Sequence, residues 1–374
     1  MKTAVIGGGS IGLAAALVCE RAGHEVTVFD PSGFEDFDTS DEINARVWAL
    51  GPSATDFLSE LGVLFSSERI CPYRSMRVID ARSDAKVAFF DPQLGHVVEA
   101  DLIRKLLLKR VAQTKIKCLA KQVIQASKTG SLQLENGQQV NAQFVIFAEG
   151  RQAHAACSSG FEKIEGDHRQ RAVVGTLKCT LPHNFEAFQI FTDVGPLALL
   201  PLPENSGEPR ISVVWSLPTD LANQWCQWTP EQLAAHISKK SEWSRGELEF
   251  VGTPVWISIS QHALKQDALG CCLALGDTAH GILPLAGLGA NLGFGDVIAL
   301  DDALCYHPKA SAEQIARAVA RERRFEHRTV AMMMELFSDA FRSDRPICQL
   351  ARSFAFRTAD RYPMIRRLVQ EFVG

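Results

Sequence analysis

A glycine-rich turn near the start of the chain has the residue types and spacing of a phosphate-binding site. The apolar run 3–6 precedes this turn and a helical pattern over 13–22 follows it. Such a turn needs glycine because the backbone bends sharply, a pyrophosphate approaches the amides, and the helix packs close to the strand. The first N–H groups of the helix then face the phosphates. The pattern predicts a dinucleotide site at Gly7, Gly8, Gly9, Ser10, Ile11 and Gly12.

A carboxylate after the next strand strengthens this prediction. The strand pattern 25–29 ends at Asp30, 18 residues after Gly12. At that place a carboxylate can accept hydrogen bonds from both ribose hydroxyls of an adenosine. A tight turn without a ligand is the alternative, but it would not require the strand, the helix and the acid together. These features do not distinguish NAD from FAD.

A second glycine-rich segment lies near residue 280. A strand pattern ends in Gly276 and Asp277, a loop with one proline and three glycines follows, and a helix pattern runs from about Asn291 to 303. A carboxylate at a strand end can bind polyol hydroxyls, and a helix N-terminus stabilises negative charge on a ring such as a reduced flavin. Within this segment His280 could deprotonate or orient a phenol. The alternatives are a loop without a ligand and a histidine bonded to the backbone.

The elements that position these residues predict an α/β protein. Strands alternate with helices at the start of the chain, consecutive strands fill about 170–260, and helices dominate from 293 onward. Alternation implies a parallel sheet and consecutive strands imply an antiparallel one. We expect a discontinuous Rossmann-like nucleotide domain over 1–70, 97–167 and 261–305. We expect a mostly antiparallel β-sheet substrate domain over 71–96 and 168–260, and a C-terminal helical region over 306–374.

The second segment, G-D-T-A-H-x-x-x-P-x-x-G-x-G-x-N-x-G, resembles the ribityl-binding segment of the FAD-dependent aromatic hydroxylases, the group A flavoprotein monooxygenases. Further stretches are similar to the ubiquinone-biosynthesis hydroxylases of that group, so the resemblance spans nearly the whole chain. They are 46–53, 191–203, 213–215 and the tail from 328 to 374. The resemblance implies the para-hydroxybenzoate hydroxylase-like fold and FAD as the cofactor.

The resemblance also implies roles for individual residues. Gly7, Gly9, Gly12 and Asp30 would hold the ADP half of FAD, and Arg46 would lie near its phosphates or ribityl chain. Asp277 would bind the ribityl chain, and His280 and Pro284 are the candidate catalytic residues beside the flavin. The isoalloxazine ring would be lined by Pro284, Gly287, Gly289, Ala290 and Asn291.

Four places depart from the family pattern. Glu149 and Ala153 stand where relatives have Asp and Ser, and the segment 98–102 lacks an Asn-Arg pair. In the flavin segment Leu288 replaces Gln and Gly295 replaces Arg. These departures could mark an unusual substrate pocket, a weaker grip on FAD, or a relative that no longer hydroxylates.

Composition limits the partners. The chain has 39 Lys+Arg, 43 Asp+Glu and a net charge of −4 without a long run of either sign, so we expect no nucleic-acid partner. Its ten cysteines form no C-x-x-C pair and no His/Cys cluster at ligand spacing, which predicts reduced thiols and no metal site. No stretch reaches the roughly 18 apolar residues of a membrane span. We expect a cytoplasmic protein.

The substrate side of the prediction is an apolar aromatic compound. The segment 195–203 could supply an apolar wall for a prenylated phenol, or be ordinary sheet core. Trp225, Trp228 and Trp243 could form a lip of the pocket, or simply pack. The C-terminal segment 352–374 alternates basic and apolar residues and could lie on the inner face of a membrane, or dock on its own domain.

Three functions remain open at this point. The first is a monooxygenase in which NADH or NADPH visits transiently to reduce FAD, O2 forms a flavin hydroperoxide, and one oxygen enters a quinone-precursor ring in ubiquinone biosynthesis. The second is a flavoprotein that oxidises or reduces a lipid or quinone without inserting oxygen. The third is a non-catalytic relative in a quinone-biosynthesis complex.

Overall fold

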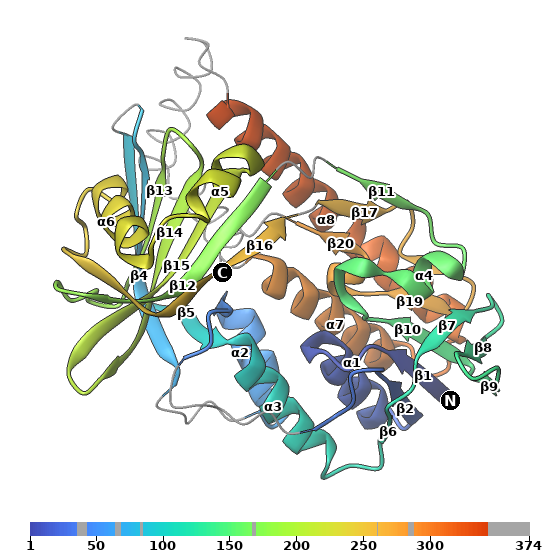
Figure 1. Cartoon of the computed structure of the whole chain (residues 1–374). Helices are drawn as coiled ribbons and strands as arrows, with labels where there is room; N and C mark the ends of the chain where they lie inside the picture. The colour runs from blue at the N-terminus through green and yellow to red at the C-terminus, as the bar shows by residue number, and fades with distance from the viewer. Residues whose placement is uncertain are drawn as a thin grey trace.

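The computed structural model of the chain describes residues 1–35, 43–63, 69–82, 85–166, 170–259, 261–282 and 288–342. Two β-sheets form its two sides, with the larger sheet at the left of Figure 1. The helices α7 (Leu288–Tyr306) and α8 (Ala312–Arg342) run through the region between them (Figure 1). Within these residues, no helix combines the length and the apolar character that a membrane crossing requires.

Six strands form the sheet that contains the N-terminus, in the order β18–β19–β10–β1–β2–β6. All neighbours are parallel except β18 and β19, which are antiparallel. The strands are β1 (Lys2–Ile6), β2 (Glu25–Phe29), β6 (Lys117–Leu119), β10 (Phe144–Phe147), β18 (Ala268–Leu269) and β19 (Cys272–Ala274). Strands as far apart in the sequence as β1 and β19 therefore lie in one sheet.

Both faces of this parallel sheet are covered. One face packs against α7, α1 (Ser10–Arg21), α2 (Pro52–Glu60) and α3 (Ala100–Val111). The other packs against α4 (His154–Ser158) and a three-stranded sheet of β7 (Val123–Ala126), β8 (Ser131–Leu134) and β9 (Gln139–Asn141). Strands covered on both faces need apolar side chains at consecutive positions. The sequence Phe-Val-Ile-Phe of β10, buried at all of its positions, meets that requirement.

The larger sheet has eight strands in the order β16–β12–β15–β14–β13–β4–β5–β3. The β13–β4 pair is parallel and the other pairs are antiparallel. Its strands are β3 (Val47–Leu50), β4 (Cys71–Asp80), β5 (Ala85–Glu99), β12 (Gln170–Cys179), β13 (Glu186–Phe191), β14 (Pro196–Asn205), β15 (Glu208–Pro218) and β16 (Leu248–Ile259). This sheet takes β3 from the segment 1–70, and the domain boundaries drawn from the sequence stay a prediction.

The two faces of the larger sheet have different partners. Odd-numbered residues of β14 and β15, such as Leu199 and Val213, pack beneath α5 (Thr219–Trp225) and α6 (Pro230–Lys240). Even-numbered residues point to the opposite face because side chains alternate along a strand. On that face Val214 belongs to an apolar cluster with Ile282 and Leu292, which flank the loop 283–287. The even-numbered face is therefore the one that adjoins the second glycine-rich segment.

A small sheet joins the two sides. It has the order β11–β17–β20 and comprises β11 (Lys163–Glu165), β17 (His262–Leu264) and β20 (His280–Gly281). Two short 3-10 helices, η1 (Gly150–Gln152) and η2 (Gly276–Thr278), lie beside it in sequence. Of the predicted C-terminal region 306–374, α8 is helical to Arg342. The basic and apolar pattern of 352–374 lies outside the described residues.

Candidate functional site

The first glycine turn has the close contacts that its motif predicts. Gly7 has a φ of +110°, and a Cβ added there would lie 2.2 Å from the carbonyl oxygen of Ala148. A Cβ on Gly12 would lie 2.0 Å from the carbonyl oxygen of Gly7. A Cβ on Gly9 would meet no atom within 4 Å. The turn is thus packed at Gly7 and Gly12 and open at Gly9.

The helix that follows this turn offers donors for an anion. α1 begins at Ser10, which is buried, and its N-cap Gly9 makes no side-chain capping bond. The first N–H groups of a helix lack partners within the helix and carry partial positive charge. The open space at Gly9 and these N–H groups together fit the pyrophosphate of a dinucleotide.

Asp30 lies beside the same turn. One of its carboxylate oxygens accepts a hydrogen bond from the Gly8 N–H at 2.6 Å, and the other accepts one from the Ser32 N–H at 2.9 Å. Each carboxylate oxygen can accept more than one hydrogen bond. The carboxylate is therefore fixed in place while keeping acceptor capacity for ribose hydroxyls.

Arg104 is a residue of this turn that the sequence analysis missed. It extends from α3, and its Nε and Nη2 donate to the carbonyl oxygens of Gly8 at 2.8 Å and Gly33 at 3.0 Å. These bonds tie the glycine turn to the loop after β2. No local spacing relates position 104 to positions 8 and 33, so only the packing of α3 on the sheet could have indicated this contact.

Ile11 brings the two glycine-rich segments together. A Cβ on Gly293 of α7 would lie 2.8 Å from Ile11 Cδ1, and a Cβ on Gly276 of η2 would lie 3.3 Å from Ile11. The start of α1 thus lies against both the strand end and the helix of the second segment. Two motifs that are more than 260 residues apart in sequence form one site.

Asp277 occupies the strand end of the second segment. Its Oδ2 lies 3.2 Å from Nε of Arg151, and Arg151 Nη2 donates to the carbonyl oxygen of Ile282 at 2.8 Å. The other carboxylate oxygen faces Gly289, where an added Cβ would lie 3.8 Å from it. Arg151 therefore links Asp277 to the start of the loop 283–287, a link that the sequence analysis missed.

His262 supports the same turn from β17. Its Nε2 lies 2.9 Å from the carbonyl oxygen of Asp277 and donates to it. Burial lowers the pKa of His262 to about 4, so the ring is neutral at neutral pH. A Cβ on Gly281 would lie 2.5 Å from this ring, so the ring and the backbone of β20 are in close contact. No recognisable sequence motif contains His262.

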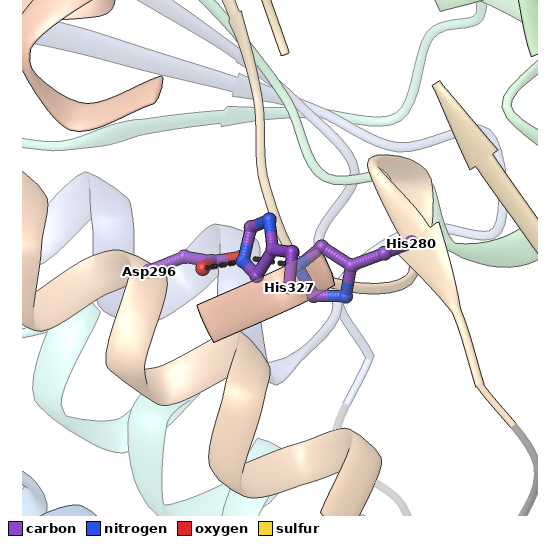
Figure 2. Close-up of side chains that lie close together, drawn as sticks. All are labelled: His280, Asp296 and His327. Atoms are coloured by element: carbon purple, nitrogen blue, oxygen red, sulfur yellow. Dashed lines mark hydrogen bonds and ion pairs between the residues drawn. The ribbon is translucent and has the colours of Figure 1, made fainter. Parts of the chain in front are cut away.

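His280 points into a buried charge cluster. Figure 2 shows the rings of His280 and His327 side by side, both directed at Asp296. His280 Nε2 lies 2.8 Å from Asp296 Oδ2, and His327 Nε2 lies 2.7 Å from Oδ1. Arg323 Nε donates to the same Oδ1 at 2.8 Å, and the Gly276 N–H donates to Oδ2 at 2.9 Å. The hydrogen-bond partner of His280 is thus a carboxylate, and not the backbone group that the sequence suggested as an alternative.

The residue types in this cluster are those that bind metals, but the positive charge of Arg323 in the same cluster disfavours a metal ion. Ligand atoms of His280, Asp296 and His327 lie within 4.8 Å of one another. The guanidinium of Arg323 already lies on the same carboxylate, and its positive charge opposes a cation there. We interpret the cluster as hydrogen-bonded ion pairs, and the absence of a metal stays a prediction.

The remaining predicted residues lie around the second segment. Asn291 Oδ1 accepts the Gly51 N–H at 3.0 Å, and its Nδ2 donates to the Ala49 carbonyl at 2.9 Å. It therefore ties the start of α7, with Gly289 and the half-buried Ala290, to the end of β3. Arg46 is exposed, with its guanidinium carbon 5.8 Å from the centre of the Trp48 ring. Pro284 and Gly287 lie outside the described residues.

Comparison with known proteins identifies the family. A family model described as an FAD binding domain matches residues 1–333. The chain belongs to this FAD-binding family. The 3-demethoxyubiquinol 3-hydroxylase of Escherichia coli is 27% identical over 382 residues, covering 98% of this chain and 96% of the relative. The ubiquinone hydroxylase UbiL of Rhodospirillum rubrum is 26% identical over 383 residues, covering 97% and 87%.

Solved structures share the fold of this FAD-binding protein. The flavin-dependent brominase Bmp2 superposes with a TM-score of 0.79 at 14% identity, covering 100% of this chain and 93% of that one. The tetrameric form of 2-methyl-3-hydroxypyridine-5-carboxylic acid oxygenase superposes with a TM-score of 0.71 at 15% identity, covering 92% and 93%. At this identity the likeness concerns the fold alone. The predicted family, fold class and FAD cofactor are confirmed.

Two departures from the family pattern have a structural account in this FAD-binding protein. The two carboxylate oxygens of Glu149 accept the N–H groups of Ala155 at 3.0 Å and Ala156 at 2.7 Å, so Glu149 binds the first turn of α4. At Gly295 an added Cβ would lie 2.6 Å from Nη2 of Arg323, so the α8 arginine fills the space beside this glycine. The side chain of Leu288 lies outside the described part.

Residues of the predicted apolar wall alternate between two core clusters. In β14, Leu197 and Leu199 pack under α5 and α6, while Leu200 and Leu202 lie on the even-numbered face. Trp225 packs with its ring centre 5.1 Å from that of the buried Trp215, and Trp228 stacks on Trp225 at 4.9 Å. Trp225 and Trp228 therefore pack with the core beneath the helices, which was the alternative to a lip of the pocket. Trp243 is 51% exposed.

Proposed function

We propose that this FAD-binding protein is a monooxygenase that hydroxylates an aromatic ring of a prenylated quinone precursor in ubiquinone biosynthesis. The observation that supports it most is similarity over 98% of the chain to a 3-demethoxyubiquinol 3-hydroxylase. Further support is that Ile11, at the start of α1, lies against Gly276 and Gly293 of the second segment. We infer that His280 and Pro284 are the residues nearest to the reacting atoms of FAD and the substrate.

The residues of the chain bind and orient, and the cofactor supplies the difficult chemistry. Reduced by NADH or NADPH, FAD would supply the electrons that activate O2, and O2 would supply the oxygen atom that enters the ring. The N–H groups at the start of α1 would bind the pyrophosphate, and Asp30 and Asp277 would accept hydrogen bonds from ribose and ribityl hydroxyls. Arg151 would hold Asp277 in that orientation.

An apolar environment suits the expected substrate. Ala172, Val174 and Val214 of the larger sheet pack with Ile282 and Leu292, which flank the loop 283–287. Apolar walls favour a ring with a hydrocarbon tail over a charged benzoate and exclude water from the reacting atoms. We infer that the substrate ring lies between this face and the flavin.

The test is reconstitution with FAD followed by turnover. We expect a yellow protein that oxidises NADH or NADPH faster when a short-chain prenylphenol is added, and a product that carries one atom from isotope-labelled O2. Turnover that continues without O2 would favour a lipid or quinone oxidoreductase without oxygen insertion. A colourless protein that does not retain FAD would favour a non-catalytic member of a biosynthetic complex.

We also propose contact with an anionic membrane surface through 352–374. Its support is the sequence pattern, in which Arg357, Arg361, Arg366 and Arg367 alternate with apolar residues. The full chain is expected to sediment with vesicles that contain anionic lipid, and a chain ending at residue 351 is not. Equal sedimentation of the two would contradict membrane contact.

A further inference from the structure

Asp296 is the meeting point of four separate elements. Its side chain is 2% exposed, and its two oxygens accept from η2, β20 and α8 as well as holding its own helix, α7, in place. The bond from Gly276 fixes the strand end that precedes Asp277. The bond from His280 fixes the first residue of β20, which follows Asp277. One carboxylate therefore holds the chain on both sides of Asp277.

We propose that Asp296, with Arg323 and His327 on α8, positions the segment 276–280, which carries Asp277, for FAD. This inference rests on the binding of FAD. It assigns to α8, which lies outside both glycine-rich motifs, a role in the affinity for the cofactor. These are positioning residues, because they act on FAD through His280 and Gly276.

Charge balance explains why α8 is needed. A buried carboxylate without partners is strongly unfavourable, and removal of one partner of a buried pair leaves an uncompensated charge. Arg323 and His327 supply two positive groups to Asp296, and burial opposed by His280 and His327 leaves the pKa of Asp296 well below its usual range. The carboxylate is therefore ionised and holds its donors at all ordinary pH values.

Two carboxylates face the ring of His327 and favour its charged form. Burial alone would lower its pKa, but Asp296 and Asp267 outweigh burial and raise the pKa to about 9. The groups that face it are Asp296 from α7, Asp267 from the turn before β18 and His280 from β20. On α8 itself Arg323 adjoins it, and Arg323 is paired with Glu326.

The ionised carboxylate also sets the tautomer of His280. Asp296 can only accept, so His280 Nε2 carries a proton and Nδ1 is left as an acceptor when the ring is neutral. Nδ1 is buried and has no hydrogen-bond partner within the described part of the chain. Loss of Asp296 or of His327 would free the ring to rotate or change tautomer, and the segment 276–280 would lose one of its anchors.

The first experiment measures FAD affinity of the apoprotein by flavin fluorescence quenching. We expect His327→Ala to raise the Kd for FAD about tenfold or more, and His327→Gln, which keeps a donor but not the charge, to restore part of that loss. Arg323→Gln is expected to act in the same direction. Its matched control is Arg317→Gln, on the same helix but with a 73% exposed side chain.

The pH dependence separates positioning from a merely structural contact. The wild-type Kd should be constant below about pH 8 and rise as the pH passes 9, because the charged His327 is lost there. His327→Gln should remove this step, and His307→Gln, which alters an exposed histidine, should retain it. A wild-type Kd without a step, or a step that His327→Gln retains, would overturn the proposal.

A second readout does not depend on FAD. Hydrogen exchange of peptides covering 276–282 in the apoprotein should be faster in His327→Ala and Arg323→Gln than in the wild type, with β12 and β15 unchanged. Unchanged exchange in variants that fold would overturn the positioning role. If the wild type binds no FAD but the exchange difference is present, the proposed function fails while the role of α8 in holding 276–282 stands.

A milder variant keeps the test open if these variants do not fold. Gly295→Ala places a methyl group 2.6 Å from Arg323 Nη2 and should displace that guanidinium. It is expected to weaken FAD binding in the wild type but not in an Arg323→Ala background, where the space is free. Equal effects of Gly295→Ala in the two backgrounds would contradict the proposed role of Arg323.

Discussion

The two halves of the cofactor site are built in different ways. The glycine turn of α1 is built mainly from close backbone contacts, with Gly7, Gly12 and Asp30 within one β–α–β unit and Ala148 packed against Gly7. The segment around Asp277 depends on side chains from distant elements, including Arg151, Asp296 and His327. The first half is therefore fixed by backbone packing, whereas the geometry of the second half depends on α7 and α8. Substitutions in the two halves should therefore have different effects on stability, pH dependence and FAD affinity.

The largest effect is expected in the backbone-built half. Gly12→Ala brings a methyl group within 2.0 Å of a carbonyl oxygen that cannot move away. We expect a loss of more than about 3 kcal/mol in the free energy of unfolding, measured by urea denaturation. Gly9→Ala, which meets open space, is the control and should unfold like the wild type. Equal stability of the two variants would show that the turn is not packed as described.

The next largest effect is a dependence of stability on pH, which should arise in the half of the site that contains His327. The folded-state pKa of His327, about 9, lies above its ordinary value of 6.5, so its contribution to stability is complete below pH 6.5 and is lost as the pH rises through 9. The loss is about 3 kcal/mol at most, since each pKa unit corresponds to about 1.4 kcal/mol. Urea denaturation at pH 6 and pH 10 should show a smaller difference in His327→Gln than in the wild type. A difference that is the same in both would contradict this prediction.

The contact between the halves should have an intermediate effect. Ile11→Ala removes the side chain that lies between Gly276 and Gly293 and should lower stability by about 2 kcal/mol. Ile11→Val, which keeps most of the volume, should lose much less. Hydrogen exchange of α1 and of 276–282 should rise together in Ile11→Ala. A rise in only one of these segments would show that they are not coupled through Ile11.

The smallest change in stability is expected at Asp30. Asp30→Asn retains an acceptor for the Gly8 N–H but weakens bonds to ribose hydroxyls, so FAD affinity should fall about tenfold with stability within about 1 kcal/mol of the wild type. The pH step in FAD affinity should persist in this variant, because that step belongs to the other half. Its disappearance would mean that the two halves titrate as one.

The sequence predicted the family, the fold class and the FAD cofactor because their signals are local. Gly7, Gly12 and Asp30 follow a fixed spacing around one strand and one helix, and Asp277 follows the end of another strand. The residues that complete the site were missed because their partners are set by tertiary packing. Arg104, Arg151 and His262 meet their carbonyl and carboxylate partners only after distant elements are placed.

One signal for the buried charge cluster was present in the sequence. α7 is apolar around most of its circumference, and a charged residue such as Asp296 is rarely buried in such a helix without a partner. That observation predicts a positive group nearby, but it does not say which helix supplies it. Gly295 carried the complementary signal, since a missing side chain beside a buried acid leaves room for one from elsewhere. The pair Gly295 and Arg323 becomes evident only when α8 lies on α7.

The order of strands in the parallel sheet affects how the protein is made. All strands of the larger sheet are present once Ile259 has been synthesised. In the parallel sheet, β1 can pair with β10 only after β10 is made, and β10 can pair with β19 only after Cys272–Ala274 is made. The charge cluster is completed only at His327. During synthesis the N-terminal glycine turn is therefore exposed on the nascent chain before Ala148 and the second glycine-rich segment are made, and the site for FAD is complete only when nearly the whole described chain has left the ribosome.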